Sequence, residues 1–241
     1  MKKNEILIFL PTLNEQENIA PLLGELFHLY KNCDFYIIDD ASRDDTIKNI
    51  NRLRIPNLTV LVRSHRLGIG SAHKMAISFA CAEKYKILVT MDSDGTHRPI
   101  DVRKLLDNIL ENDLVIGSRF IDKDSVLGWS WFRRFLTSSG HLVTKIGLGI
   151  HYDCSSGFRA YNLTRNSFKD IIATNDNHYD FFYKSLYNFH KNNPGKISEV
   201  AITLLARSSG NSKLSIHLAI SSISKLVVDI IRFRLNKILV R

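Results

Sequence analysis

The sequence predicts one α/β domain with a Rossmann-like first half and a mostly parallel sheet. Short apolar runs alternate with segments of helical spacing, and the runs are continuously apolar instead of alternating with polar residues. Continuous apolar strands are expected where helices cover both faces of a parallel sheet. A chain of 241 residues, 44% of them hydrophobic, is long enough for one core of this kind.

The predicted elements of the first half follow one another as strand and helix. Five apolar runs are predicted as strands, at 6–10, 35–38, 58–62, 87–91 and 114–116. Apolar residues recur with helical spacing in three segments between them, at 17–30, 75–82 and 102–110.

The second half is less regular. Residues 122–128 are polar and loop-like, residues 129–148 mix aromatic, basic and apolar residues, and 157–161 and 197–202 are candidate strands. We therefore expect a catalytic domain over residues 1–215 and a helical appendage over 216–241.

The appendage has the pattern of a basic amphipathic helix. A helical stripe is formed by eight apolar residues, Ile216, Ile220, Ile223, Val227, Ile230, Ile231, Leu235 and Ile238. Five basic residues accompany a single acid, Asp229; they are Lys225, Arg232, Arg234, Lys237 and Arg241. Charges inside the stripe argue against a spanning helix and favour an anionic membrane surface as its partner. Packing on the core or on a second subunit is the alternative.

The remaining global features concern location and partners. The apolar run after Met1 is too short for a signal peptide or a spanning helix, so we expect a cytoplasmic protein, peripheral on the inner face of the membrane. A net charge of +9 fits nucleic acid, anionic lipid or phosphate-bearing substrates. The three cysteines are far apart and are expected to be free thiols.

Polar residues follow four of the predicted strands directly, at 11–15, 39–42, 92–94 and 117–119. In an open α/β sheet, ligands bind beyond the carboxyl ends of the strands. Asp92 and Asp94 flank one serine. Two carboxylates at such a short distance repel each other unless a cation lies between them. Mg²⁺ or Mn²⁺ bridging to a diphosphate fits this pair, whereas solvated or helix-capping acids are the alternative.

Other strand ends carry weaker signals. Asp39 and Asp40 are suited to accept hydrogen bonds from a base or ribose, although this loop also offers helix caps. Gly68 and Gly70 would let the backbone approach a phosphate, but they lack the spacing of a dinucleotide fingerprint. Neither a zinc-protease HExxH nor a GxSxG nucleophile motif is present.

Basic residues are the notable feature of the second half. Arg119 follows a strand, Arg133 and Arg134 follow two tryptophans, and Arg207 and Lys213 bracket a Ser- and Gly-rich loop. Arginine and lysine at such positions are suited to clamp phosphates. The alternative for each one is a solvated surface charge.

Taken together, these segments resemble family 2 glycosyltransferases of the GT-A fold, and within them the polyprenyl-phosphate group that includes dolichol-phosphate mannose synthases. The resemblance runs from about residue 5 to about residue 215, through segments 11–18, 38–46, 91–99, 117–119, 153–161, 198–200 and 207–213. The chain departs from that pattern at Leu13, where Tyr is frequent, and at Lys184, near which the family often has an acid.

The resemblance implies roles for individual positions. The nucleotide and its donor sugar would be held by Pro11, Leu13, Glu15, Asp40, Asp92, Arg207 and Lys213, the last two on a loop that closes over the donor. The metal, Mg²⁺ or Mn²⁺, would be bound by Asp92, Asp94 and Thr96. The acceptor phosphate would be gripped by Arg119, Arg133 and Thr137. The residues closest to the chemistry would be Asp94, Arg119 and Arg133.

The expected activity is transfer of a sugar, with inversion, from a nucleoside diphosphate sugar to a polyprenyl phosphate. A phosphate acceptor is already anionic, so it needs positioning more than a base. A glycosyltransferase acting on a sugar hydroxyl is the first alternative, with Asp176 or Asp180 as base. A non-catalytic nucleotide or nucleic-acid binder is the second, but it does not explain the paired acids, and no nucleic-acid partner is expected. A homodimer or a small membrane partner is left open.

Overall fold

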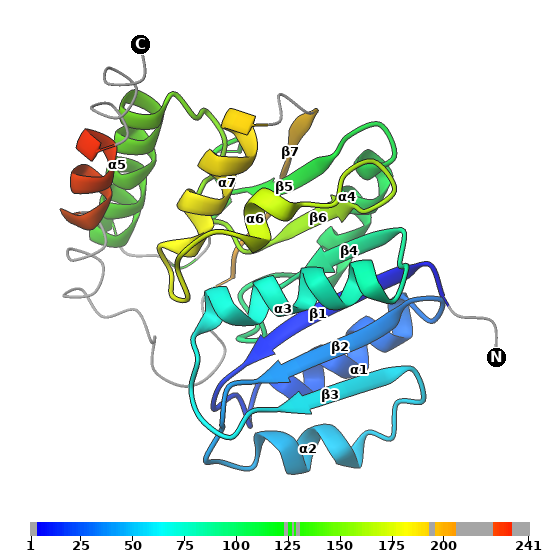
Figure 1. Ribbon diagram of the computed structural model, residues 1–241. Helices are drawn as coiled ribbons and strands as arrows, with labels where there is room; N and C mark the ends of the chain where they lie inside the picture. Colours follow the sequence, from blue (N-terminus) through cyan, green and yellow to red (C-terminus); the bar gives the residue numbers. More distant parts are fainter. Residues whose placement is uncertain are drawn as a thin grey trace.

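A mixed sheet forms the centre of the protein, with helices on both of its faces (Figure 1). The computed structural model describes residues 4–122, 125, 126, 128, 131–192, 196–205 and 224–232, with the side chains of all of these except 132, 133 and 192. Within these residues the sheet has seven strands in the order β3-β2-β1-β4-β6-β5-β7. The strands are β1 (Ile6–Thr12), β2 (Asp34–Asp39), β3 (Leu58–Val62), β4 (Ile87–Thr90), β5 (Leu114–Ser118), β6 (Arg159–Asn162) and β7 (Ile197–Ala201).

Strand direction divides this sheet into two parts. β3, β2, β1 and β4 run parallel to one another, and β5 and β7 are parallel as well. β6 lies between the two parts and is antiparallel to both β4 and β5. Every predicted strand is present, and the expectation of a mostly parallel sheet is confirmed, with β6 as the exception.

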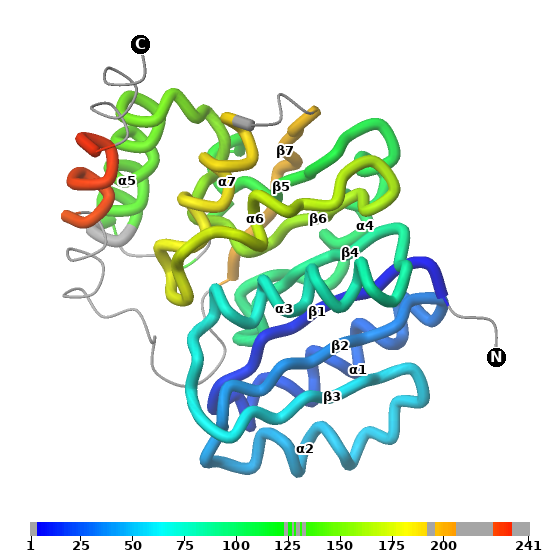
Figure 2. The backbone as a smooth tube through the Cα atoms, in the orientation of Figure 1, coloured from blue at the N-terminus to red at the C-terminus, as the bar shows by residue number. Residues whose placement is uncertain are grey.

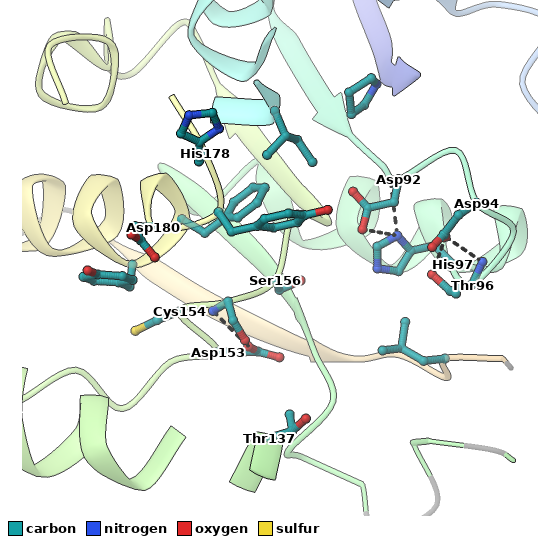
Figure 3. Close-up of a pocket in the computed structure, with 18 of the residues that line it drawn as sticks. Asp92, Asp94, Thr96, His97, Thr137, Asp153, Cys154, Ser156, His178 and Asp180 are labelled. Atoms are coloured by element: carbon teal, nitrogen blue, oxygen red, sulfur yellow. Dashed lines mark hydrogen bonds and ion pairs between the residues drawn. The ribbon is translucent and has the colours of Figure 1, made fainter. Parts of the chain in front are cut away.

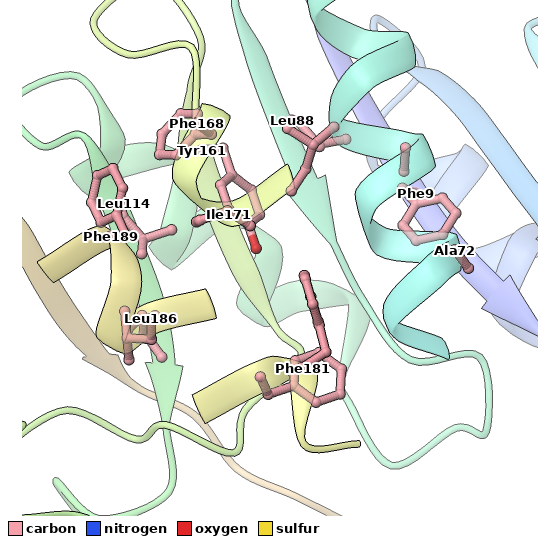
Figure 4. Close-up of a cluster of buried hydrophobic side chains, with 14 of the residues drawn as sticks. Phe9, Ala72, Leu88, Leu114, Tyr161, Phe168, Ile171, Phe181, Leu186 and Phe189 are labelled. Atoms are coloured by element: carbon pink, nitrogen blue, oxygen red, sulfur yellow. The ribbon is translucent and has the colours of Figure 1, made fainter. Parts of the chain in front are cut away.

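The helices form two layers. They are α1 (Ile19–Leu29), α2 (Thr46–Arg52), α3 (Ile69–Ala82), η1 (Pro99–Asp101), α4 (Val102–Ile109), α5 (Trp131–Leu148), α6 (Lys169–Ile172) and α7 (Phe181–Asn192). Leu7 and Phe9 of β1 belong to one buried cluster with residues of α3, α6 and α7 (Figure 4). Ile8 and Leu10, on the opposite face, belong to a second cluster with residues of α1 and α4. Both faces are therefore buried, which accounts for the continuous apolar strands.

Residues 224–232 are helical and lie beside α5 (Figure 2). Leu226 and Ile230, one turn apart, are only 5% and 9% exposed, whereas Val227 and Ile231 face outward. Ile230 packs so closely on Gly147 of α5 that a Cβ at that glycine would overlap it. This part of the tail is docked on the domain, which is the alternative that the sequence left open, and Ile230 is not part of an outward-facing stripe. Residues 216–223 and 233–241 lie outside the described residues.

Two further expectations are answered by the described residues. Cys33 and Cys154 are buried, Cys81 is partly buried, and all three are free thiols, as predicted. The described helices include none with the length and apolar character needed to cross a membrane.

Candidate active site

A cavity of about 400 Å³ opens at the carboxyl ends of β1, β2 and β4 (Figure 3). It gathers nine of the residues predicted for the site, namely Pro11, Leu13, Glu15, Asp40, Asp92, Asp94, Thr96, Arg119 and Thr137. Arg207, Lys213 and the side chain of Arg133 lie outside the described residues. The strand ends thus converge on one pocket, as the topology of an α/β sheet requires.

Asp39 and Asp40, at the end of β2, organise the loops around the pocket. Asp39 is fully buried and accepts hydrogen bonds from the Thr12 hydroxyl (2.9 Å) and the Ser42 amide (2.8 Å). Asp40 accepts hydrogen bonds from the amides of Leu67 (2.8 Å) and Gly68 (2.9 Å). It also pairs with the Arg63 guanidinium, at 2.9 Å.

The contacts of Asp40 determine its charge. Burial alone would raise the pKa of Asp40, but the amides of Leu67 and Gly68 and the Arg63 guanidinium lower it below its usual value. Asp40 is therefore a stable anion, and its contacts hold the Arg66–Gly68 turn at the rim of the pocket.

The glycines before α3 are explained by a contact within the protein. Gly68 has φ of 91°, and a Cβ there would overlap the carbonyl oxygen of Asn177. The amide of Gly70 donates to that same carbonyl at 2.8 Å. The group that approaches these glycines closely is therefore the backbone of residues 177–178. From the sequence, a phosphate is expected there. A glycine is needed because one chain segment crosses another here.

The two carboxylates after β4 differ in their surroundings. The Oδ1 atom of Asp94 accepts hydrogen bonds from the Thr96 amide (3.1 Å) and hydroxyl (2.7 Å). The Oδ1 atom of Asp92 is buried and has no hydrogen-bond partner among the described residues. Burial, together with the charge of Asp94, raises the pKa of Asp92. A buried carboxylate oxygen without a donor, next to a second carboxylate, fits a divalent cation.

The described residues add no third His, Cys, Asp or Glu to this pair in a metal-binding cluster. The remaining ligands of a Mg²⁺ or Mn²⁺ ion would then be substrate phosphate oxygens and water, as is usual for these ions. The hydroxyl of Thr96, a predicted metal ligand, donates to Asp94 and so orients that carboxylate.

His97 is a site residue that the sequence did not single out. Its ring is buried and stacks on Phe158, with 4.9 Å between ring centroids. The Nδ1 atom accepts a hydrogen bond from the Asp92 amide at 3.2 Å. The same nitrogen lies 3.8 Å from the Asp92 carboxylate, but as an acceptor it carries no proton for an ion pair. His97 therefore fixes the backbone of Asp92. In the sequence, the feature that could have indicated this role is its position three residues after Asp94.

Arg119 is held in a fixed orientation by Asp153, a partner that only the tertiary structure reveals. The Nε and Nη2 atoms of Arg119 donate to the two carboxylate oxygens at 2.8 and 3.2 Å, and Nη2 also reaches Ser155 at 2.9 Å. Asp153 is fully buried, which opposes its charge, but the guanidinium outweighs burial and lowers its pKa. The pair is bidentate, so it presents the Arg119 head group rigidly to the cavity.

A model of the glycosyl transferase family 2 matches residues 7–170. The chain belongs to this family. It is 33% identical over 214 residues to the undecaprenyl-phosphate mannosyltransferase of Micrococcus luteus, covering 87% of each protein. It is 31% identical over 215 residues to the polyprenol monophosphomannose synthase of Mycolicibacterium smegmatis, covering 87% of this chain and 80% of the relative.

A solved structure supports the fold of this glycosyltransferase. Glucosyl-3-phosphoglycerate synthase from Mycobacterium tuberculosis, in complex with Mn²⁺, UDP and phosphoglyceric acid, superposes with a TM-score of 0.68 at 19% identity. The match covers 94% of this chain and 78% of that one. The GT-A expectation is confirmed, and family membership decides against the non-catalytic alternative.

A buried arginine connects two segments that line the glycosyltransferase pocket, the loop of residues 153–156 and the start of α7. Arg159, at the start of β6, is fully buried and donates to the carbonyls of Cys154 (3.0 Å), Ser156 (2.8 Å) and Phe182 (3.0 Å). Its guanidinium also lies over the Phe182 ring, 5.5 Å from the centroid. Several fixed donors on one side chain tie the loop that carries Asp153 to the start of α7.

The far end of the cavity is formed by α5, α7 and residues 224–232. Asp180 lies there, well separated in Figure 3 from Asp92 and Asp94. Its carboxylate is 3.5 Å from the Nζ atom of Lys225. Asp176, the other predicted candidate base, pairs with Lys184 at 3.1 Å and is not among the residues lining the cavity.

Proposed function

We propose that this family 2 glycosyltransferase transfers a sugar from a nucleoside diphosphate sugar to a polyprenyl phosphate, with inversion at the anomeric carbon. The observation that carries the proposal is the lining of one cavity by an Asp92–Asp94 pair at one end and by the Arg119 guanidinium further along. The names of the two bacterial relatives, a polyprenol monophosphomannose synthase and an undecaprenyl-phosphate mannosyltransferase, support the same acceptor class.

The donor end is proposed around the strand ends. Pro11, Leu13, Glu15 and Asp40 line the side of the cavity where the nucleotide would bind. Asp92 and Asp94, with Thr96 orienting Asp94, would hold Mg²⁺ or Mn²⁺ against the diphosphate. A bound divalent ion would neutralise charge on the departing nucleoside diphosphate. The similar structure that contains Mn²⁺ and UDP supports this choice of ligands.

The acceptor end is proposed around Arg119. Together with Arg133 and Thr137, Arg119 would grip the acceptor phosphate, and Arg207 and Lys213 would close over the donor. One phosphate oxygen forms the new bond to the anomeric carbon while the bond to the nucleoside diphosphate breaks. The attacking oxygen is already anionic and no proton has to be removed, so the residues supply orientation and charge.

The sugar-hydroxyl alternative rests on Asp180, which lines the cavity. A hydroxyl acceptor would need a general base within hydrogen-bond reach. Asp180 is instead engaged by the Lys225 ammonium at 3.5 Å, and it lies at the end of the cavity away from Asp92 and Asp94. This contact favours the phosphate acceptor.

We infer that the enzyme works peripherally at the anionic, cytoplasmic face of a membrane, where a polyprenyl phosphate presents its head group. Four apolar residues of α5 are between 55% and 77% exposed; they are Trp131, Phe135, Leu142 and Ile146. At 100° per residue these four lie within about 60° of one another around the helix axis. Leu136, Thr137, Gly140 and Thr144, on the opposite face of α5, line the cavity.

That arrangement supports membrane contact near the acceptor end. One helix therefore separates the cavity from an exposed apolar stripe. The net charge of +9 favours an anionic surface. Lys225, which is expected from the sequence to contact anionic lipid, instead lies beside Asp180. The exposed stripe on α5 is therefore the main support for membrane contact.

The experiment that tests the function compares matched acceptors. Full-length protein with Mn²⁺ is first screened for thermal stabilisation by nucleoside diphosphate sugars, including GDP-mannose and UDP-glucose. The stabilising donor is then offered farnesyl phosphate, farnesol and 3-phosphoglycerate. We expect product from farnesyl phosphate alone and loss of turnover with EDTA. Product from a hydroxyl acceptor but none from farnesyl phosphate would overturn the proposal.

A further inference from the structure

The far end of the cavity is closed by a segment from the C-terminal part of the chain, which we term the C-terminal wall (residues 224–232). Leu226 of this wall is buried and lines the cavity together with Leu136 of α5 and Tyr183 of α7. The next residue, Val227, is 43% exposed on the outer side of the same helix. The wall therefore presents one side chain to the cavity and its neighbour to the outside.

Polar contacts fasten the C-terminal wall to α7. The Oδ2 atom of Asp229 accepts a hydrogen bond from the Tyr183 hydroxyl at 2.7 Å and lies 3.1 Å from the Lys184 Nζ atom. Lys184 also pairs with Asp176 at 3.1 Å. Partial burial disfavours the charged form of Lys184, but the hydrogen bonds to both acids outweigh it and raise its pKa.

These contacts give Lys184 a function in this chain. Lys184 lies in the helix where the resemblance leads one to expect an acid that this chain lacks. A lysine there bridges two carboxylates, one on the loop before α7 and one on the wall. Lys225 adds a second link, 3.5 Å from Asp180. Gly147 leaves room for Ile230, so the wall is also seated against α5.

We propose that the C-terminal wall is part of the acceptor site, that Leu226 contacts the hydrocarbon next to the acceptor phosphate, and that Lys184 and Asp229 are positioning residues that hold the wall in place. The proposal rests on the proposed function. The wall lies at the end of the cavity away from Asp92 and Asp94, beside Asp180, and it adds an apolar side chain there. An apolar surface at that end suits the first isoprene units of a lipid.

The contact is tested with L226A and L226W in full-length protein, and with V227A as the matched control on the outer face. Removing the Leu226 contact should raise the KM for farnesyl phosphate about tenfold and leave the donor KM within about twofold. L226W should block farnesyl phosphate more strongly than L226A. V227A should change neither KM. Thermal unfolding midpoints near wild type establish that the variants are folded.

The fastening is tested by D229A and D229N. Asn keeps an oxygen that accepts from Tyr183 and Lys184, so D229N should retain most of the wild-type acceptor KM, whereas D229A should resemble L226A. Amide hydrogen exchange of residues 224–232 should become faster in D229A only. Unchanged exchange in D229A would overturn the fastening.

The outcomes distinguish the two proposals. If wild-type protein transfers sugar to farnesyl phosphate and L226A does so with the same KM, the lipid contact is wrong and the function stands. If wild-type protein transfers to no polyprenyl phosphate, the proposed function is wrong and the lipid contact falls with it.

Discussion

At one end of the cavity, Asp92 and Asp94 stand on the loop that directly follows β4. At the other end, Asp180, Tyr183 and Leu226 come from α7, its preceding loop and the C-terminal wall. The first group is set by a strand and the few residues after it, with Thr96 and His97 as local supports. The second group exists only because distant segments pack together.

This difference has consequences for substitutions. A change at Asp92 or Asp94 should remove chemistry and leave the fold, because the hydrogen bonds described for these residues go to Thr96 and His97 of the same loop. At the far end, removal of the Leu226 or Asp229 side chain should alter the packing of the C-terminal wall and acceptor binding together. Arg119 and Asp153 lie between the two cases, since their ion pair is both buried and part of the cavity.

The largest effect is expected at the strand-end acids. Asp94→Asn removes one carboxylate from the proposed metal pair and should lower kcat by about a thousandfold. Its unfolding midpoint should stay near wild type, because Asn still accepts from Thr96. Calorimetric titration with Mn²⁺ should show the matching loss of metal affinity. Asp107→Asn, an exposed acid on α4, is the control; full activity of Asp94→Asn would contradict the metal role.

The second effect concerns stability at the middle of the cavity. Asp153→Asn leaves Arg119 without its buried partner and should lower the free energy of unfolding by about 3 kcal/mol at pH 7. The pKa of Asp153 is lowered in the folded state, so its stabilisation is full above the unfolded value of about 3.9 and is lost as the pH falls toward the folded value.

Urea unfolding at several pH values measures this difference. The gap between wild type and Asp153→Asn should be constant from pH 7 down to about pH 5 and should narrow below about pH 4. Asp107→Asn should show no such gap. A gap that widens as the pH falls would contradict the assigned direction of the shift.

The third effect separates the two acceptor classes. Arg119→Ala should lower kcat/KM for farnesyl phosphate about a hundredfold, because a charge-assisted grip on the phosphate is lost. Since this variant also leaves Asp153 buried and unpaired, the Arg119→Ala/Asp153→Ala double variant is measured beside it. Asp180→Asn should retain activity within about threefold. The opposite order, with Asp180→Asn inactive and Arg119→Ala active, favours a hydroxyl acceptor.

The smallest effect is expected outside the cavity, on the exposed stripe of α5. Replacing Phe135 and Ile146 by Ser should lower binding to anionic vesicles about fivefold, because shallow burial of two apolar side chains is lost. Co-sedimentation at low and high salt measures this, and Leu110→Ser, an equally exposed change elsewhere, is the control.

A chain ending at Ser215 separates the stripe from the tail in the same assay. Equal binding by this chain and the full protein assigns the membrane contact to α5, whereas lost binding assigns it to the tail. An insoluble truncated protein is the result expected if the wall belongs to the core.

The amino-acid sequence by itself determined the strand-helix order, the continuous apolar strands and the polar strand ends. These features are local, since a strand and the loop after it are specified by neighbouring residues. Pro11, Asp40, Asp92, Asp94 and Arg119 were found in this way, and all five line one cavity. Family resemblance added Thr137, whose role no local pattern indicates.

Tertiary structure alone decided the pairings between distant segments. Nothing local in Arg159–Asn162 says that β6 inserts antiparallel between β4 and β5, because strand direction follows from how the connections pack. The same holds for Asp153 beside Arg119 and for Asp229 beside Lys184. The sequence shows a charged residue at each position, but only packing brings opposite charges together. The tail illustrates this best, because one apolar helix pattern is compatible both with a membrane surface and with packing on a core. For residues 224–232, the contacts with α5 and α7 show packing on the core.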